Sequence, residues 1–283
     1  SGKSALAVHL AKHFNGEVIS ADSRQVYKGL DIGTGKITKN EMAGIPHHLL
    51  DVVYPKKIFS VAQFKKKADK VIQDIFKKNK LPILCGGTGF YIDAVINNHV
   101  LPDVPPNKNL RKELTKKDPA ELFKILSKLD PVRAKVIDKY NPVRLIRAIE
   151  IASALGKVPK VKINRAYQTL FIGIAPNESI LRKQINIRLL KRMKQGMVRE
   201  ATRLHAGGLS FKRMEELGLE YKYLSLLLQK KITKEKFLND LESAIWHYVK
   251  RQLTWFKKNK EIQWFANNQN PEIRKIVAQF IRK

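Results

Sequence analysis

The sequence is poor in cysteine and has no long hydrophobic run. Cys85 is the single cysteine among 283 residues, which excludes a disulfide framework and a cluster of thiolate metal ligands. A reducing compartment is therefore favoured, and we expect a cytoplasmic protein. No apolar run approaches the roughly 20 residues that a membrane-spanning helix needs, and no signal peptide is visible, so we expect no membrane partner.

Acidic residues are also scarce. The chain has 25 Asp and Glu against 55 Lys and Arg, which gives a net charge of +30. An excess of this size repels itself unless it meets a polyanion, so nucleic acid or an anionic membrane is the expected class of partner. The alternative is a lysine-rich composition shared by a whole proteome, and the lysine run 65–67, typical of a solvated helix face, supports it. Charge alone does not decide between the two.

Strand-like and helix-like patterns alternate along the chain, which predicts an α/β fold with a parallel sheet. We predict strands within 17–23, 47–53, 81–89, 169–176 and 262–266, and helices over 4–14 and from an N-cap at Ser60 to residue 80. The rest is helical and basic, with two or three helices in 106–160. The segment 181–208 is predicted as one helix or two, ending at Gly207-Gly208. No repeat or low-complexity linker is visible, so we expect one core in two parts, 1–105 and 168–283, around a mainly helical insertion, 106–167.

The first four residues, Ser-Gly-Lys-Ser, match the end of a phosphate-binding loop, G-x-x-x-x-G-K-[ST]. In such a loop, the N–H groups of the first helical turn lack partners within the helix and bind an anion. Lys3 would bridge phosphate oxygens, and the Ser4 hydroxyl would ligate Mg²⁺. A Gly-Lys-Ser tripeptide is also frequent by chance, and an ordinary N-capped helix is the alternative.

Three further features support a ligand site. Asp22 and Ser23 lie at the carboxyl end of the strand predicted within 17–23, which is where ligands bind in open α/β sheets. A carboxylate there suits a magnesium partner, a general base or an N-cap. The turn "CGGTG" at 85–89 places Thr88 within reach of a ligand, or else serves only tight strand-to-helix packing. Arg144 and Arg147, three residues apart, share a helix face.

Together these stretches resemble the tRNA dimethylallyltransferase (isopentenyltransferase) family. The resemblance rests on segments in family order over nearly the whole chain: "DSRQVYKGLDIGTGK" at 22–36, "HHLLD" at 47–51, "GGTGFY" at 86–91, "NPVRLIRAIEI" at 141–151 and "KRQLTWF" at 250–256. The C-terminal zinc finger of eukaryotic relatives is absent from this sequence, which favours a bacterial-type enzyme. The resemblance implies a P-loop NTPase-like parallel sheet flanked by helices, with a helical insertion that binds tRNA.

The resemblance also implies an activity. Family members transfer a dimethylallyl group from dimethylallyl diphosphate to N6 of the adenosine at position 37 of tRNA, just 3′ of the anticodon. We accordingly expect the anticodon stem-loop and the prenyl diphosphate as partners, Mg²⁺ as cofactor and a monomeric enzyme.

Site residues follow by position. The diphosphate would be bound by Ser1, Gly2, Lys3 and Ser4. Ser4 is also predicted to be catalytic, because its hydroxyl would position Mg²⁺. Asp22 matches the general base. The positions that match tRNA contacts are Asp22, Ser23, Arg24, Gln25, Thr88, Arg111, Val143, Arg144, Leu145, Ile146 and Arg147.

Physical chemistry agrees with these roles. Allylic displacement builds negative charge on the leaving diphosphate, which Lys3, Mg²⁺ and the loop N–H groups can stabilise. The adenine must leave its stack to be reached. Aromatic side chains among cations suit base stacking or core packing, and packing is favoured for each one singly: Trp246, Tyr248, Trp255 and Phe256, near Lys250 and Arg251. His47 and His48 are adjacent on a strand and face opposite ways, which argues against a shared metal ion.

The sequence departs from the family in two places. The family loop reads Gly-Pro-Thr-Ala before Ser1 and follows a hydrophobic strand, and neither is present. We expect exposed apolar surface and unpaired backbone on the neighbours of such a strand, an unstable or inactive polypeptide as written, and a longer natural protein. Near 215–224 the family's compact Ile-Gly-Tyr-Lys motif is altered. The identity of the basic residue that helps to bind the diphosphate is therefore undecided, with Arg213 and Lys222 as the candidates.

Two other functions stay open at this point. A P-loop kinase of small metabolites shares the loop and the fold and would bind ATP. A non-catalytic RNA-binding protein would retain the basic surface alone.

Overall fold

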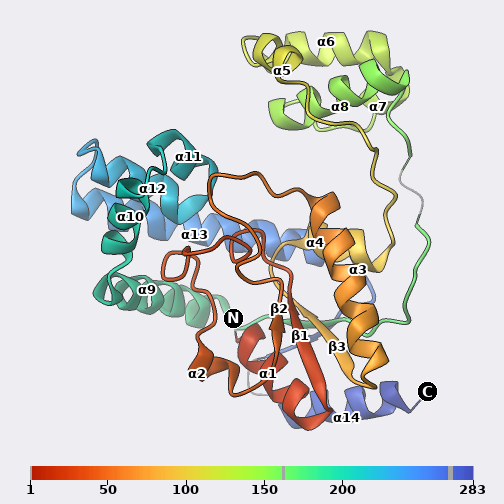
Figure 1. Ribbon diagram of the computed structural model, residues 1–283, viewed down its shortest axis with the longest axis vertical. Coiled ribbons are helices and arrows are strands. Elements are labelled where there is room, and N and C mark those ends of the chain that lie inside the picture. The colour runs from red at the N-terminus through yellow and green to blue at the C-terminus, as the bar shows by residue number, and fades with distance from the viewer. Residues whose placement is uncertain (1, 161–162, 267–269, 283) are drawn as a thin grey trace. The chain divides into compact units, whose positions relative to one another are not determined.

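The structure, a computed structural model, describes residues 2–160, 163–266 and 270–282 (Figure 1). It divides into two compact units, each described by itself below. The core unit contains residues 1–97 and 165–283, and the insert unit contains residues 98–164. In sequence, the insert unit therefore interrupts the core unit.

The strands of the core unit form two parallel sheets. The first has the order β2-β1-β3, with β1 at Gly16–Ser20, β2 at His47–His48 and β3 at Leu81–Cys85. The second pairs β4 (Ile172–Ile174) with β5 (Gln263–Phe265). Strands alternate with helices along the chain, so the predicted α/β class with parallel pairing is confirmed.

The two sheets lie on a common hydrophobic cluster although their strands are not paired with each other. Leu81 and Ile83 of β3 pack in the same cluster as Ile172 and Ile174 of β4. Among the residues described, β3 pairs with β1 alone and β4 with β5 alone, and all five residues of β3 are partly exposed. Each of these strands therefore has one edge without a strand neighbour, in line with the unpaired backbone that the sequence led us to expect.

The strands are shorter than predicted, for local reasons. The segment predicted at 47–53 keeps only two strand residues, because Leu49 and Asp51 adopt left-handed backbone (φ 62° and 55°) that ends an extended chain. Val53 then pairs with Tyr27 in a single isolated parallel β-bridge. The strand predicted within 81–89 ends at Cys85, and a helix begins at Gly89.

Helices surround these strands. Those of the core unit are α1 (Lys3–His13), α2 (Lys39–Met42), α3 (Val61–Lys77), α4 (Gly89–Ile96), α9 (Glu178–Gln195), α10 (Met197–Ala206), α11 (Phe211–Glu216), α12 (Leu219–Leu228), α13 (Lys234–Phe256) and α14 (Asn270–Ile281). The predicted N-cap of α3 is confirmed, since Ser60 and Gln63 form a capping box. The segment 181–208 is two helices, because Gly196 (φ 99°) separates α9 from α10.

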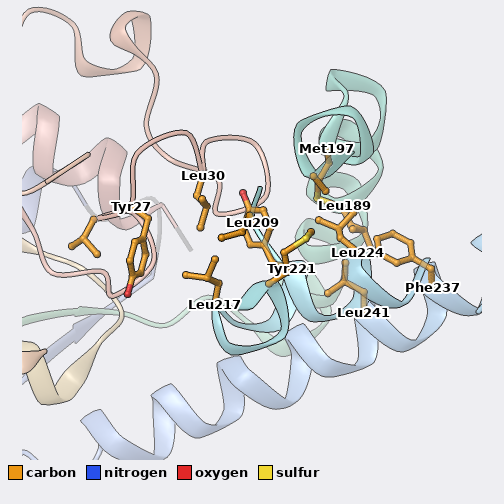
Figure 2. Close-up of a cluster of buried hydrophobic side chains, with 13 residues drawn as sticks. Tyr27, Leu30, Leu189, Met197, Leu209, Leu217, Tyr221, Leu224, Phe237 and Leu241 are labelled. Atoms are coloured by element: carbon orange, nitrogen blue, oxygen red, sulfur yellow. The ribbon is translucent and has the colours of Figure 1, made fainter. Parts of the chain in front are cut away.

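The largest buried cluster joins distant parts of the chain (Figure 2). Tyr27 and Leu30, from the loop after β1, pack with residues of the C-terminal helices, including Tyr221 and Phe237. Tyr221 and Phe237 are among the largest fully buried side chains. The helices α9, α10, α12 and α13 therefore hold the loop that follows β1 in a fixed place.

The insert unit is a small helical body with its own core. Its helices are α5 (Lys108–Leu114), α6 (Pro119–Leu129), α7 (Pro131–Ala134) and α8 (Pro142–Leu155). The core of the unit is built from fully buried leucine and isoleucine side chains on α6 and α8, among them Leu122, Leu126, Leu145 and Ile149. Side chains of Asn107, Asp118, Asp130 and Asn141 cap the four helices. Across the described parts of both units, no helix is at once long and apolar enough to span a membrane.

Candidate active site

The candidate site lies where β1 and β3 end, and its central residue is Asp22. Asp22 Oδ1 accepts hydrogen bonds from the N–H groups of Arg24 (2.8 Å) and Gln25 (3.3 Å). This is an Asx turn, in which an aspartate side chain closes the backbone onto itself. Oδ2 accepts no hydrogen bond from the part of the chain that the structure describes, so one carboxylate oxygen is left for a ligand.

The "GGTG" turn at 86–89 is hydrogen-bonded to the loop that carries Asp22. Ser23 donates its N–H to Thr88 Oγ1 (3.0 Å), and Thr88 donates its N–H to the Ala21 carbonyl (3.1 Å). A Cβ on Gly86 would overlap with the Ala21 carbonyl, so the close approach of the two loops requires glycine there. Thr88 thus holds the backbone beside Asp22, a role that the sequence left open between ligand reach and packing.

Helix α13 closes the other side of the turn. Gln252 donates from Nε2 to the Gly87 carbonyl (2.8 Å), and Trp255 donates from Nε1 to Asp93 (3.0 Å). Side chains on Gly87 and Gly89 would collide with Gln252 and Trp255. Trp255 therefore packs against the glycine turn.

Two other aromatic side chains of α13 meet cations instead. The Trp246 ring has Arg182 (4.1 Å) and Lys250 (5.4 Å) over it, and Arg251 lies over Tyr248.

The start of α1 brings a lysine into the same place. Burial lowers the pKa of Lys3, while the negative charge of Asp22 raises it and the positive charge of Arg188 lowers it. These groups are therefore within electrostatic reach of one another. Ser4 is exposed in the first turn of α1, and Gly2 precedes it with φ 79°. Ser1, also predicted to hold phosphate, lies outside the described residues.

Helices α9 and α12 add charged groups that the sequence analysis missed. Arg192 donates from Nη1 to the Gly33 carbonyl (3.2 Å) and to Glu220 Oε1 (3.4 Å). Burial raises the pKa of Glu220, and the charges of Arg192, Asp22 and Arg24 also act on it. Arg188 lies one helical turn before Arg192. This spacing of four was the available signal, since it places both guanidinium groups on one face of α9.

The two basic residues proposed from the sequence, Arg213 and Lys222, differ in their burial and partners. Arg213 donates from Nε to the Pro55 carbonyl (2.8 Å) and from Nη2 to the Lys57 carbonyl (2.7 Å), so its guanidinium braces a loop. Lys222 is exposed on α12. Arg188 is the basic residue whose charge acts on Lys3.

A buried glutamate shapes the turn at 31–35, which lies beside the Asp22 loop. Glu200, 2% exposed, accepts the N–H groups of Asp31 (3.0 Å), Ile32 (2.8 Å) and Gly33 (2.9 Å), together with the Tyr221 hydroxyl (2.6 Å). These bonds fix the backbone of the turn. Gln25, predicted to meet tRNA, then donates from Nε2 to the Gly35 carbonyl (3.3 Å).

Arg24 is directed by a different contact. It donates from Nη1 to the Glu216 carbonyl (3.4 Å), so its side chain spans from the Asp22 loop to the end of α11.

The other predicted tRNA contacts lie in the insert unit. Arg111 binds Glu150 through Nε (2.9 Å) and Nη2 (2.8 Å), and Arg147 binds the same carboxylate. These bonds, together with the N–H of Asn107, hold the pKa of Glu150 at about 2 although burial alone would raise it. Arg144 is exposed at the start of α8.

Three apolar positions belong to the same predicted set. Val143 is exposed at the start of α8, whereas Leu145 and Ile146 lie in the core of the insert unit. The side chains of Leu145 and Ile146 are therefore not presented to a ligand.

The paired histidines have ordinary structural partners. His48 Nε2 lies 2.7 Å from Glu17 Oε2, and His47 Nδ1 lies 2.8 Å from the Ile45 carbonyl. Within the described ranges no group of three or more His, Cys, Asp or Glu side chains is placed to hold a metal ion. Burial raises the pKa of Cys85 to about 11, which keeps this thiol neutral.

Comparison with known proteins places this geometry in a family. The family model "IPP transferase" matches residues 25–259. A protein named tRNA dimethylallyltransferase 2 from Treponema denticola is 44% identical over 264 residues, which cover 91% of this chain and 88% of that one. The tRNA dimethylallyltransferase of Anoxybacillus flavithermus is 40% identical over 270 residues, covering 93% and 86%.

Solved structures agree. The full-length tRNA isopentenylpyrophosphate transferase of Bacillus halodurans matches with a TM-score of 0.75 at 36% identity, covering 99% of this chain and 93% of that one. A eukaryotic dimethylallyltransferase described as acting on tRNA matches with a TM-score of 0.85 at 26% identity, covering 99% and 77%. With a family match over most of its length and relatives at this level of identity, the chain belongs to the IPP transferase family.

Proposed function

We propose that this protein is a tRNA dimethylallyltransferase, which moves the dimethylallyl group of dimethylallyl diphosphate onto N6 of the adenosine at position 37, just 3′ of the anticodon. The names of its relatives support prenyl transfer to tRNA. The observation that carries the proposal is the placement of Asp22, fixed by its Asx turn and within electrostatic reach of Lys3. A general base and a phosphate-binding cation within electrostatic reach of each other are what this reaction needs.

Asp22 acts as the general base. The adenine N6 attacks the allylic carbon, so a C–N bond forms while the C–O bond to diphosphate breaks. N6 must lose a proton in this step, and Asp22 Oδ2 is the oxygen left to accept it because Oδ1 is engaged by the backbone. The aspartate therefore acts through one defined oxygen.

The diphosphate binds at the start of α1. N–H groups of the first turn lack helical partners, and the Lys3 side chain adds a cation. Arg188 supplies a second cation, since its charge reaches Lys3. Together these groups stabilise the charge that develops on the leaving diphosphate.

We also propose Mg²⁺ as a cofactor. Mg²⁺ is usually held by few protein ligands together with substrate phosphates. The exposed Ser4 hydroxyl beside the phosphate site fits this donor set, and no preformed carboxylate cage is required. When bound, the ion would neutralise charge on the diphosphate.

Each unit, taken by itself, offers groups for binding the tRNA. The target adenine must be extruded from the anticodon loop to reach Asp22. Ser23, Arg24, Gln25 and Thr88 lie in or against the Asp22 loop, while the insert unit offers the exposed Val143 and Arg144 and the Glu150-bound Arg111 and Arg147. Because the substrate is a tRNA, we place the enzyme in the cytoplasm, and we propose that it acts as a monomer.

Transfer of label from dimethylallyl diphosphate to an anticodon stem-loop tests the proposal. Wild-type protein should label the stem-loop, and a stem-loop with guanine in place of the target adenine should stay unlabelled. Asp22→Asn keeps the Oδ1 acceptor for Arg24 and Gln25 but removes the base, so the rate should fall roughly 10²- to 10⁴-fold with RNA affinity unchanged. Transfer by Asp22→Asn at the wild-type rate would disprove the role of Asp22.

The two alternatives predict other results. A small-metabolite kinase would be stabilised by ATP and would transfer phosphate. A non-catalytic RNA-binding protein would bind the stem-loop without transferring any label.

A further inference from the structure

The insert unit carries an exposed apolar stretch that its own core does not use. Val136, Tyr140 and Val143 are 74%, 75% and 76% exposed, and Val132 is 64% exposed. The core of the unit is formed instead by Ala134, Leu145 and other residues on its inner side. Exposing four large apolar side chains within 131–144 costs solvation free energy, which indicates a surface with a binding role.

The backbone of this stretch is well defined. Val132 and Val136 are four residues apart on a helical turn that continues past α7, since Val136 and Ile137 both donate to the Arg133 carbonyl. Asp138 Oδ1 accepts the N–H of Tyr140 (3.1 Å), which forms a turn between α7 and α8. Tyr140 is thus presented on a fixed turn.

The charges around the apolar side chains are mainly positive, although Asp138 Oδ2 lies 4.0 Å from Arg144 Nη1. Four exposed cations lie in 131–144, namely Arg133, Lys135, Lys139 and Arg144, against one exposed acid, Asp138. Lys139 Nζ lies 5.2 Å from the Tyr140 ring centroid, and the Arg144 side chain is 58% exposed. Such a surface is complementary to a polyanion that also has flat apolar groups.

We propose that Tyr140, which lies between the exposed Val136 and Val143 in the sequence, is a stacking platform for an unpaired nucleotide of the RNA substrate, with Lys139 and Arg144 binding the adjoining phosphates. The inference rests on the proposed function, because it assigns the platform to the same tRNA. RNA loops are recognised through bases that stack on aromatic rings, while nearby cations hold the backbone. A second copy of this chain fits less well, because a symmetric contact would bring the four cations of each copy together.

The test measures binding of a labelled anticodon stem-loop to the full chain by fluorescence anisotropy. Tyr140→Ala should weaken binding about 5- to 150-fold, the range expected for one base–aromatic stack. Tyr140→Phe should bind as wild type does, and Tyr140→Leu, which keeps apolar area without a ring, should bind nearly as weakly as the alanine variant. Leu155→Ala is the control, because Leu155 is 50% exposed at the other end of α8 and should not change affinity.

Salt dependence separates the platform from the cations. Tyr140→Ala should leave the slope of log affinity against log salt unchanged, since no charge is removed. Arg144→Ala should reduce the magnitude of that slope by about 0.7 to 0.9. The fold of each variant is checked by thermal unfolding, which an exposed substitution should not alter.

Several results would overturn the platform. Affinity of Tyr140→Ala within twofold of wild type would do so, as would equal losses in Tyr140→Ala and Leu155→Ala. Concentration-dependent dimers that Tyr140→Ala dissociates, with RNA affinity unchanged, would assign the surface to a second copy. If wild-type protein transfers prenyl groups and Tyr140→Ala binds RNA normally, the platform fails and the proposed function stands. If Tyr140→Ala weakens RNA binding but wild-type protein transfers nothing, the platform stands and the proposed function fails.

Discussion

Replacing Glu200 by glutamine should destabilise the core unit strongly although the two side chains have nearly the same shape. Both carboxylate oxygens of Glu200 accept two hydrogen bonds, Oε2 from the N–H groups of Asp31 and Ile32 and Oε1 from the Gly33 N–H and the Tyr221 hydroxyl. Glutamine has one oxygen and one NH₂ group, and the NH₂ group cannot accept. Whichever way the amide is turned, two donors lose their acceptor: either the buried Gly33 N–H and Tyr221 hydroxyl, or the partly buried N–H groups of Asp31 and Ile32.

The size of the effect follows from these contacts. A buried donor left without a partner costs about 1–3 kcal/mol, so two cost about 2–6 kcal/mol. The free energy of unfolding of a typical domain is about 5–15 kcal/mol, so this loss is a large part of it. Burial and the nearby Glu200 raise the pKa of Tyr221, so its hydroxyl keeps its proton and donates a hydrogen bond to Glu200 in the wild-type protein.

Urea unfolding followed by tryptophan fluorescence measures this loss. All three tryptophans, Trp246, Trp255 and Trp264, lie in the core unit, so their signal reports that unit alone. Tyr221→Phe removes one donor and its bond, and should cost about 1 kcal/mol. Glu235→Gln, at an exposed position of α13, should cost nothing measurable. A Glu200→Gln protein as stable as Glu235→Gln would refute the reasoning.

Three further predictions concern pH, packing and ligands. Burial would raise the pKa of Glu17, but hydrogen bonds from Lys80 and His48 hold this pKa at about 2. The ionised Glu17 therefore stabilises the fold at pH values above 4.5, its ordinary pKa, by roughly 3 kcal/mol. This stabilisation is lost as the pH falls from 4.5 towards 2. Urea titrations at several pH values should show that loss in wild type and a smaller one in Glu17→Gln. Gly86→Ala should destabilise by about 1–3 kcal/mol because its methyl group meets the Ala21 carbonyl, whereas Gly207→Ala, with room for a Cβ, should not; equal unfolding midpoints for the two would contradict this. Dimethylallyl diphosphate at 100 times its Kd should stabilise by about 2.7 kcal/mol and raise the unfolding temperature, and a larger shift with ATP would instead favour the kinase.

Local patterns in the sequence were sufficient to predict much of the fold. The Ser60 capping box and the apolar stripe of α3 depend on neighbours within one helix, so both were predictable. Asp22, Ser23 and Thr88 were also found, because loops at the carboxyl ends of parallel strands meet at one edge of a sheet. Such features need only short-range patterns and one topological rule.

Other features depend on pairings between distant segments. Glu200 lies 167 residues from Gly33, and nothing near either residue indicates that contact. Arg188, Arg192 and Glu220 appear in sequence as ordinary charges on helical surfaces, and only tertiary packing brings them near Asp22. The sequence predicted unpaired strand edges but not which strands would carry them, because apolar strand patterns do not specify which edges pair.

Because of the Asx turn, the direction in which the Asp22 carboxylate points depends on the number of residues between Asp22 and Gln25. Its Oδ1 is tied to backbone groups two and three residues ahead, so the carboxylate cannot rotate to exchange its two oxygens. Adding or deleting one residue between 22 and 25 would break that closure and turn Oδ2, the proposed proton acceptor, away, even with every side chain retained. This segment should therefore tolerate changes of residue type far better than changes of length.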